Sequence, residues 1–162
     1  MRLIYRVLLL IAVLIGIVLA VVLYYVANPK LPDYVPVEQV HYLDQWDAKD
    51  RQTYYFTPQG TQVKGLRYEW FSALELPFSE QSFAAPEYLA RFGFLVEPGQ
   101  KATAQNPGNL PVGFARHQNP GSAEQYLDIT CAACHTGELR FNHQALRIDG
   151  GSAQHVLPSS VP

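Results

Sequence analysis

The segment that most constrains this 162-residue chain is an uncharged apolar run near its N-terminus. Residues 7–27, VLLLIAVLIGIVLAVVLYYVA, contain no Asp, Glu, Lys or Arg. As an α-helix the run is roughly 31 Å long at about 1.5 Å per residue, which matches the hydrocarbon core of a bilayer. The sequence therefore predicts a transmembrane anchor over residues 1–27, with membrane contact through 7–27.

A cleaved signal peptide is the alternative interpretation of this run. Signal peptides usually have an apolar region of only about 7–15 residues that ends at a small-x-small site. Residues 18–20 offer such a site, but the apolar run continues past it to Tyr24 and Tyr25, which suit a membrane interface. Its length favours an uncleaved anchor. Because Arg2 and Arg6 precede the run, the positive-inside rule predicts a cytoplasmic N-terminus and a periplasmic domain at the bacterial inner membrane.

The charges of the remaining chain exclude one class of partner. Beyond the two N-terminal arginines, the chain carries ten Lys and Arg against fourteen Asp and Glu, a net charge of −4. A nucleic-acid partner is not expected for a mildly acidic surface without a basic run.

Composition and periodicity divide the exported part into three regions. Residues 28–43 are proline-rich and predict an extended linker. Residues 44–121 predict a helical region that ends in a long loop from residue 97 onward. Residues 122–162 form the last region.

Four apolar residues predict a core-facing helical stripe within the helical region. Leu66, Trp70, Phe71 and Leu74 are spaced as on one face of a helix. We expect Trp70 to pack in the core. Two other helices are expected, one capped by Asp44 and one over residues 86–92, PEYLARF.

The last region predicts a helix followed by a β-hairpin. Ser122 and Gln125 form a capping-box pattern, so a helix is expected to start at Ala123 and run into the cysteines with both thiols on its buried face. Asn142-His143 suits a two-residue hairpin turn. In that register Glu138 lies opposite Arg147 as a cross-strand ion pair.

The two cysteines of the chain lie in one pentapeptide, CAACH, at residues 131–135. A C-x-x-C-H string is the pattern of covalent haem attachment, because thiols one helical turn apart can add to the two vinyl groups of one haem. In that chemistry Cys131 and Cys134 carry the thioethers, and His135 is an axial ligand of the iron. One covalent haem c is thus the expected cofactor.

Two other chemistries remain as alternatives for the same residues. A structural zinc site needs four Cys or His ligands, and no pair of histidines here has the usual H-x3–5-H spacing. A redox dithiol needs a βαβ context, which the flanking sequence does not indicate. The predicted compartment is oxidising, and the chain has no further cysteines, so haem attachment is favoured over the zinc site and the redox dithiol.

The second axial position of the iron is less constrained. The only methionine is Met1, on the predicted cytoplasmic side, so His/Met ligation within the chain is not expected. His117 in the long loop and His155 in the C-terminal tail are the distal candidates. Arg140 and Arg147 could pair with haem propionates, although Glu138 is an equally good partner for Arg147.

Several segments together resemble a known family. They are YYFTPQGTQ, YEWFSALELP, LARFGFL, NLPVGFAR, LDITCAACHTGELRFN and LRIDGGSA. They resemble exported or membrane-anchored bacterial c-type cytochromes related to di-haem cytochrome c peroxidases and c-type rubber oxygenases. The resemblance implies a mainly α fold in which residues 122–162 begin a cytochrome c domain, with Cys131, Cys134 and His135 in the roles given above.

Members of that family carry a second CxxCH, which this sequence lacks. We therefore expect an incomplete haem domain, either truncated or completed by another polypeptide. The expected function is electron transfer by one covalent haem to a periplasmic or membrane redox partner. The alternative is the N-terminal part of a haem-dependent oxidoreductase of the peroxidase or oxygenase type.

Overall fold

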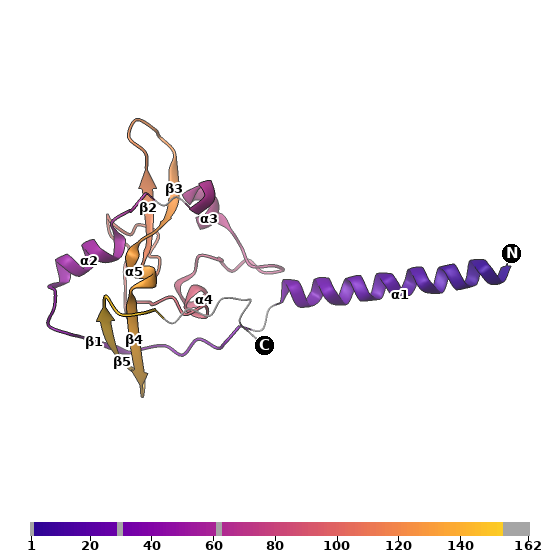
Figure 1. The fold of residues 1–162 in the computed structure, drawn as a ribbon, viewed down its shortest axis with the longest axis horizontal. Coiled ribbons are helices and arrows are strands. Elements are labelled where there is room, and N and C mark those ends of the chain that lie inside the picture. Colours follow the sequence, from indigo (N-terminus) through magenta and orange to yellow (C-terminus); the bar gives the residue numbers. More distant parts are fainter. Residues whose placement is uncertain (1, 29–30, 61–62, 154–162) are drawn as a thin grey trace. The chain divides into compact units, whose positions relative to one another are not determined.

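The computed structural model describes residues 2–28, 31–60 and 63–153, and the chain divides into two compact units, residues 1–31 and 32–162. The first unit contains one helix, α1 (Arg2–Ala27). The second contains the other elements (Figure 1).

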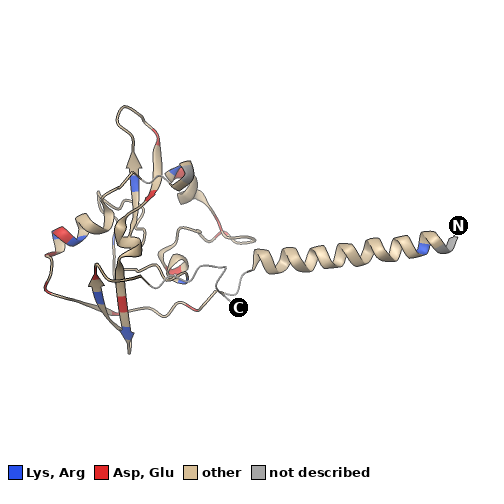
Figure 2. Cartoon of the chain, in the orientation of Figure 1, with Lys and Arg blue, Asp and Glu red and all other residues tan. Residues whose placement is uncertain are grey.

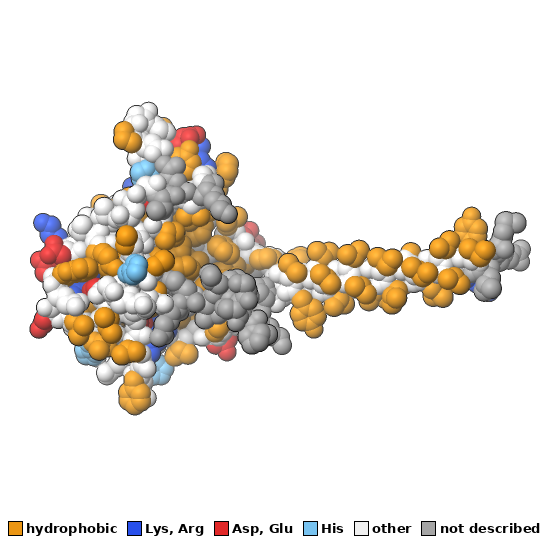
Figure 3. Space-filling model, viewed as in Figure 1, with side chains coloured by type: hydrophobic (Ala, Val, Ile, Leu, Met, Phe, Trp, Pro, Cys, Tyr) orange, Lys and Arg blue, Asp and Glu red, His pale blue; other side chains and the backbone are white. Residues whose placement is uncertain are grey.

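Helix α1 is long and apolar enough to cross a membrane. Its segment Ile4–Ala27 has a mean hydropathy of 3.3 and none of it is buried. Apolar side chains cover the helix along its length (Figure 3). The blue that marks Lys and Arg on this helix lies near its N-terminal end (Figure 2). A helix that is apolar all round suits lipid. The helix is compatible with a single-pass membrane anchor, and a signal sequence has the same properties.

The expectation of a mainly α fold is wrong. The structure is mixed, with 34% of residues in helices and 20% in strands, and the five strands among the described residues form two sheets. About half of the helical residues belong to α1, and the helices of the second unit are short. Strand pairing therefore supplies the regular framework around the cysteines, in place of the helices of a cytochrome c domain.

The first sheet has the order β1-β5-β4, from β1 (Gln39–Tyr42), β5 (Gln144–Asp149) and β4 (Thr136–Phe141). The predicted hairpin is confirmed: β4 and β5 are antiparallel, and Glu138 lies opposite Arg147. Asn142 and His143 both have positive φ, as a type I′ turn requires. Strand β1 pairs parallel to β5, so residues 39–42 of the predicted linker belong to a sheet.

The second sheet is an antiparallel pair, β2 (Phe114–Gln118) with β3 (Gln125–Ile129). The prediction of a helix that starts at Ala123 is wrong, because residues 125–129 form a strand. The loop predicted from residue 97 onward is also shorter than expected, because residues 114–118 form β2. Ser122 Oγ accepts a hydrogen bond from Glu124 N at 3.0 Å within the hairpin turn. The capping-box pattern thus marks a turn. The pairing of β2 with β3 joins residues on both sides of the region boundary predicted between residues 121 and 122.

The short helices are α2 (Ala48–Phe56), α3 (Tyr68–Ala73), α4 (Pro86–Ala90) and the 3₁₀ helix η1 (Val63–Gly65). Asp47, not Asp44, caps α2 through a 2.8 Å hydrogen bond from Asp50 N to Oδ1. Phe71 is buried as predicted, but Trp70 is 64% exposed, so its predicted core packing is wrong. Helix α3 is too short to bury the whole stripe.

Two apolar clusters form the core of the second unit. One contains Phe71, Phe114 and Leu127, which join α3 to the second sheet. The other contains Tyr55 and Phe56 of α2 with Leu95, Val112 and Ala132. Ala132 belongs to the CAACH pentapeptide, so the second cluster fixes that pentapeptide to the fold.

Candidate haem attachment site

The CAACH pentapeptide begins with a single helical turn, α5 (Cys131–Cys134), between β3 and β4. Thr130 caps it, because its Oγ1 accepts a hydrogen bond from Ala132 N at 3.2 Å. The same hydroxyl donates to the carbonyl of Tyr55 at 3.1 Å, and Thr130 N donates to the carbonyl of Gly113 at 2.8 Å. Thr130 therefore ties the start of the turn to α2 and to the segment before β2.

The turn separates its alanines from its reactive groups. Ala132 and Ala133 are only 1% and 3% exposed, whereas Cys131, Cys134 and His135 are exposed. Both cysteines are free thiols. The prediction that the thiols face the core is wrong, because that face is taken by the two small side chains between them.

Gly113 allows the backbone of the turn to approach closely. Its φ is +89°, and a Cβ at this position would lie 2.3 Å from Ala133 N and 2.4 Å from Ala133 Cα. Contacts this short are incompatible with any side chain at residue 113. The positive φ is also a conformation that glycine adopts without strain.

Replacing Gly113 with alanine is expected to lower the free energy of unfolding by about 3 kcal/mol, from overpacking added to backbone strain. Gly121 is the matched control, because it has a φ of +79° but nothing within 4 Å of an added Cβ. Gly121→Ala should cost only the strain, about 1 kcal/mol. Urea unfolding of the full chain in detergent, followed by circular dichroism, measures both. Equal losses would show that Ala133 does not restrict residue 113.

The carbonyl groups at the end of the turn are held from two directions. The carbonyl of His135 accepts hydrogen bonds from Tyr54 Oη and from Gly150 N, both at 2.7 Å. The carbonyl of Cys134 accepts one from Ala153 N at 3.0 Å. These contacts fix the backbone while the imidazole stays at the surface. Burial raises the pKa of Tyr54, so its hydroxyl stays protonated as a donor at neutral pH.

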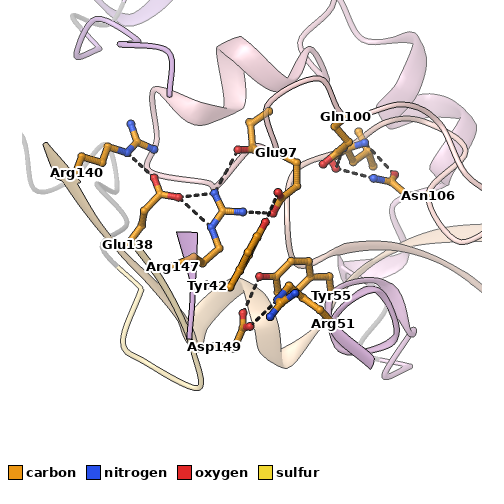
Figure 4. Close-up of polar contacts among 12 residues, drawn as sticks. Tyr42, Arg51, Tyr55, Glu97, Gln100, Asn106, Glu138, Arg140, Arg147 and Asp149 are labelled. Atoms are coloured by element: carbon orange, nitrogen blue, oxygen red, sulfur yellow. Dashed lines mark hydrogen bonds and ion pairs between the residues drawn. The ribbon is translucent and has the colours of Figure 1, made fainter. Parts of the chain in front are cut away.

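A network of polar contacts surrounds the buried side chain of Arg147 (Figure 4). Arg147 is fully buried and donates to Glu138, with Nε 2.9 Å from Oε2, and to Glu97. Tyr42 also donates to Glu97. The predicted Glu138–Arg147 pair is confirmed, and both carboxylates that bind Arg147 come from the chain itself. Arg140, with 38% side-chain exposure, also bonds Glu138.

A second ion pair continues this network to the pentapeptide. Arg51 Nε lies 2.9 Å from Asp149 Oδ2, and Tyr55 Oη donates to Asp149 Oδ1 at 2.6 Å. Asp149 is opposite Thr136 in the β4–β5 ladder, and Thr136 directly follows His135. The network therefore sets the position of the strand that leaves the site.

Two tyrosines make the network sensitive to alkali. Burial and the neighbouring carboxylates raise the pKa values of Tyr42 and Tyr55 above the ordinary value of 10.0. A raised pKa in the folded state contributes stability below pH 10 that is lost as the pH rises further.

We expect the free energy of unfolding to fall between pH 9 and pH 11 at a rate of roughly 1.4 kcal/mol per pH unit for each tyrosine once the unfolded chain ionises. The Tyr42→Phe/Tyr55→Phe variant should lose less over the same range. Urea unfolding at the two pH values measures this difference. An equal loss in both proteins would contradict a role for these hydroxyls.

The remaining predicted site residues are not gathered at the pentapeptide. His117 lies in β2, and its Nε2 is 3.1 Å from Asn119 Oδ1 within the hairpin. His155 lies outside the described residues. Over residues 2–28, 31–60 and 63–153, no three His, Cys, Asp or Glu side chains form a group that could hold a metal ion.

The exposed groups fit covalent haem attachment. Two free thiols one helical turn apart are accessible to vinyl groups, and the adjacent imidazole is exposed on the same short segment. Cys131 and Cys134 would hold the macrocycle, and His135 would ligate the iron. Their fixed backbone limits the movement of all three side chains.

Comparison with known proteins gives one informative similarity. An uncharacterized protein, y4iJ of Sinorhizobium fredii, is 36% identical over an alignment 153 residues long; the alignment covers 81% of this chain and 24% of the relative. The chain thus spans about a quarter of the length of the curated relative it matches. No protein-family model matches the chain, and no solved structure matches it.

Proposed function

We propose that this protein is a membrane-anchored c-type cytochrome that binds one covalent haem and transfers electrons. The single observation that carries the proposal is the orientation of the CAACH turn, with alanines buried and thiols and imidazole exposed. When bound, haem supplies a one-electron Fe(III)/Fe(II) couple. Residues 28–162 face the periplasm, because Arg2 and Arg6 keep the N-terminus in the cytoplasm.

The chain's own residues have separable tasks in this proposal. Cys131 and Cys134 retain the cofactor covalently, and His135 ligates the iron from one side. Tyr54 and Gly150 hold the carbonyl of His135, which fixes the backbone that carries the imidazole. The resemblance to bacterial c-type cytochromes supports the same residue roles. The mainly α fold that the resemblance implied is not the fold of this chain.

The second candidate is the N-terminal part of a haem-dependent oxidoreductase of the peroxidase or oxygenase type. It is favoured by the position of His117, a predicted distal ligand, which lies opposite Tyr126 in the β2–β3 pair and contacts Asn119 there. An open axial position suits reaction with peroxide or oxygen. The longer relative is compatible with this candidate.

Optical spectra of the purified full chain, oxidised and reduced, distinguish the two candidates. The electron-transfer proposal expects a low-spin haem whose spectrum does not change on addition of hydrogen peroxide. A high-spin spectrum with peroxide turnover would support the oxidoreductase. A protein matured in cells with a working cytochrome c maturation system that shows no haem absorption would contradict both.

A further inference from the structure

An aromatic pair connects the CAACH turn to the solvent. Trp46, just before α2, is 39% exposed, and its ring centroid lies 4.7 Å from that of Tyr54 with the planes 70° apart. Tyr54 Oη in turn lies 2.7 Å from the carbonyl oxygen of His135. An exposed indole, a phenol ring and one hydrogen bond therefore lead directly to the backbone of the proposed iron ligand.

The residues that flank this indole in the sequence include one exposed apolar side chain and three exposed acidic side chains. Leu43, three residues before Trp46, is 39% exposed. Asp44, Asp47 and Asp50 are all exposed, against one exposed lysine, Lys49, in the same stretch. We call Leu43, Trp46 and these three aspartates the Trp46 patch. Its net negative charge is complementary to a basic surface.

We infer that the Trp46 patch is the docking surface for a basic one-electron carrier protein. Electrons pass between the haem on His135 and that partner through Tyr54 and Trp46. The inference rests on the proposed haem function. One electron leaves the ferrous haem iron, which becomes ferric, and the partner's ferric centre becomes ferrous, with no bond made or broken.

The exposed aspartates and the exposed apolar side chains of the patch suit such a partner. Redox encounters use small interfaces, below about 1,200 Å² in total, with an apolar centre and charges that steer association. The other exposed indole, Trp70 on α3, provides a matched control. Its ring lies 5.9 Å from the guanidinium carbon of Arg67, and α3 packs against β3.

Stopped-flow oxidation of the ferrous full chain in detergent tests the electron route. The oxidant is a ferric mono-haem cytochrome c with a lysine-rich haem edge. We expect Trp46→Ala to lower the second-order rate constant about tenfold and Trp70→Ala to leave it unchanged. Trp46→Phe should restore most of the rate, because it keeps a ring against Tyr54. Oxidation by tris(phenanthroline)cobalt(III), a small oxidant, should be equal in all variants.

Calorimetric titration with the same cytochrome tests docking independently of electron flow. Asp44→Asn/Asp50→Asn should weaken binding about tenfold at low salt, and added salt should weaken the wild type similarly, because steering by exposed charges is screened. Asp47 is left in place because it caps α2.

Different results would contradict the haem function, the electron route and the docking surface. A wild-type chain without haem contradicts the proposed function and the electron route with it. A haem-loaded chain in which Trp46→Ala and Trp70→Ala react at equal rates overturns the route but leaves the haem function standing. Binding that is unaffected by the two asparagines overturns the docking surface.

Discussion

Replacing Arg147 with methionine is expected to lower the free energy of unfolding by about 3–5 kcal/mol. The guanidinium is fully buried between the carboxylates of Glu97 and Glu138, and it also donates to the carbonyl of Val96 at 3.2 Å. Burial alone would lower the pKa of Arg147, but the two carboxylates raise it, so the side chain is charged. Methionine fills similar space and leaves buried negative charge uncompensated.

Arg140 is the matched control for this prediction. It bonds the same Glu138 at 2.6 Å from the same hairpin, but its side chain is 38% exposed. Because solvent screens such a pair, Arg140→Met should cost less than about 1 kcal/mol. Urea unfolding of both variants, followed by circular dichroism in detergent, measures the difference. Similar losses would mean that burial does not govern the strength of these contacts.

Replacing both cysteines with alanine is expected to abolish covalent haem while leaving the fold intact. Cys131 and Cys134 are exposed, so when both proteins are made without haem their loss should change the free energy of unfolding by no more than about 0.5 kcal/mol. Haem staining of a denaturing gel detects only covalently bound haem. The wild type should stain, each single variant should stain more weakly, and Cys131→Ala/Cys134→Ala should not stain.

Histidine variants separate ligation from attachment. His135→Ala should alter the haem spectrum strongly, whereas His41→Ala, at an exposed position in β1, should leave it unchanged. Staining that persists in the double cysteine variant would place haem elsewhere. Equal haem spectra of the two histidine variants would contradict the assignment of His135 as an iron ligand.

The hairpin and the apolar helix could be predicted from the sequence because their signals are local. Asn142-His143 adopts the positive φ values that its turn needs, and it fixes the register that pairs Glu138 with Arg147. The 21-residue apolar run needs no tertiary context to be helical. The CAACH residues themselves were found by spacing alone.

The second sheet and the orientation of the thiols depend on long-range contacts. The capping-box pattern at Ser122 competed with the strand propensity of Tyr126, Leu127 and Ile129, and pairing with β2 decided the outcome. The segment NPG at residues 119–121, between two strand-like runs, is the signal that marked this hairpin. The outward thiols follow from the close approach of Gly113 to Ala133, which no periodicity records.

The contacts of Trp46 and Tyr54 could not be predicted from the sequence. Tyr54 precedes His135 by 81 residues, and only the packing of α2 against α5 brings its hydroxyl to that carbonyl. The buried network has the same origin, since Glu97 and Arg147 are separated by 50 residues. Their charges were visible in the sequence, but their partners were not.

The pyridine haemochrome spectrum of the purified, denatured wild-type chain tests the central claim most directly. The chain is expressed in cells with a working cytochrome c maturation system, and free haem is extracted before the measurement. The account predicts the band of a haem held by two thioethers, at one haem per chain. A protein that retains no haem after extraction would contradict the assignment of Cys131, Cys134 and His135 to haem attachment.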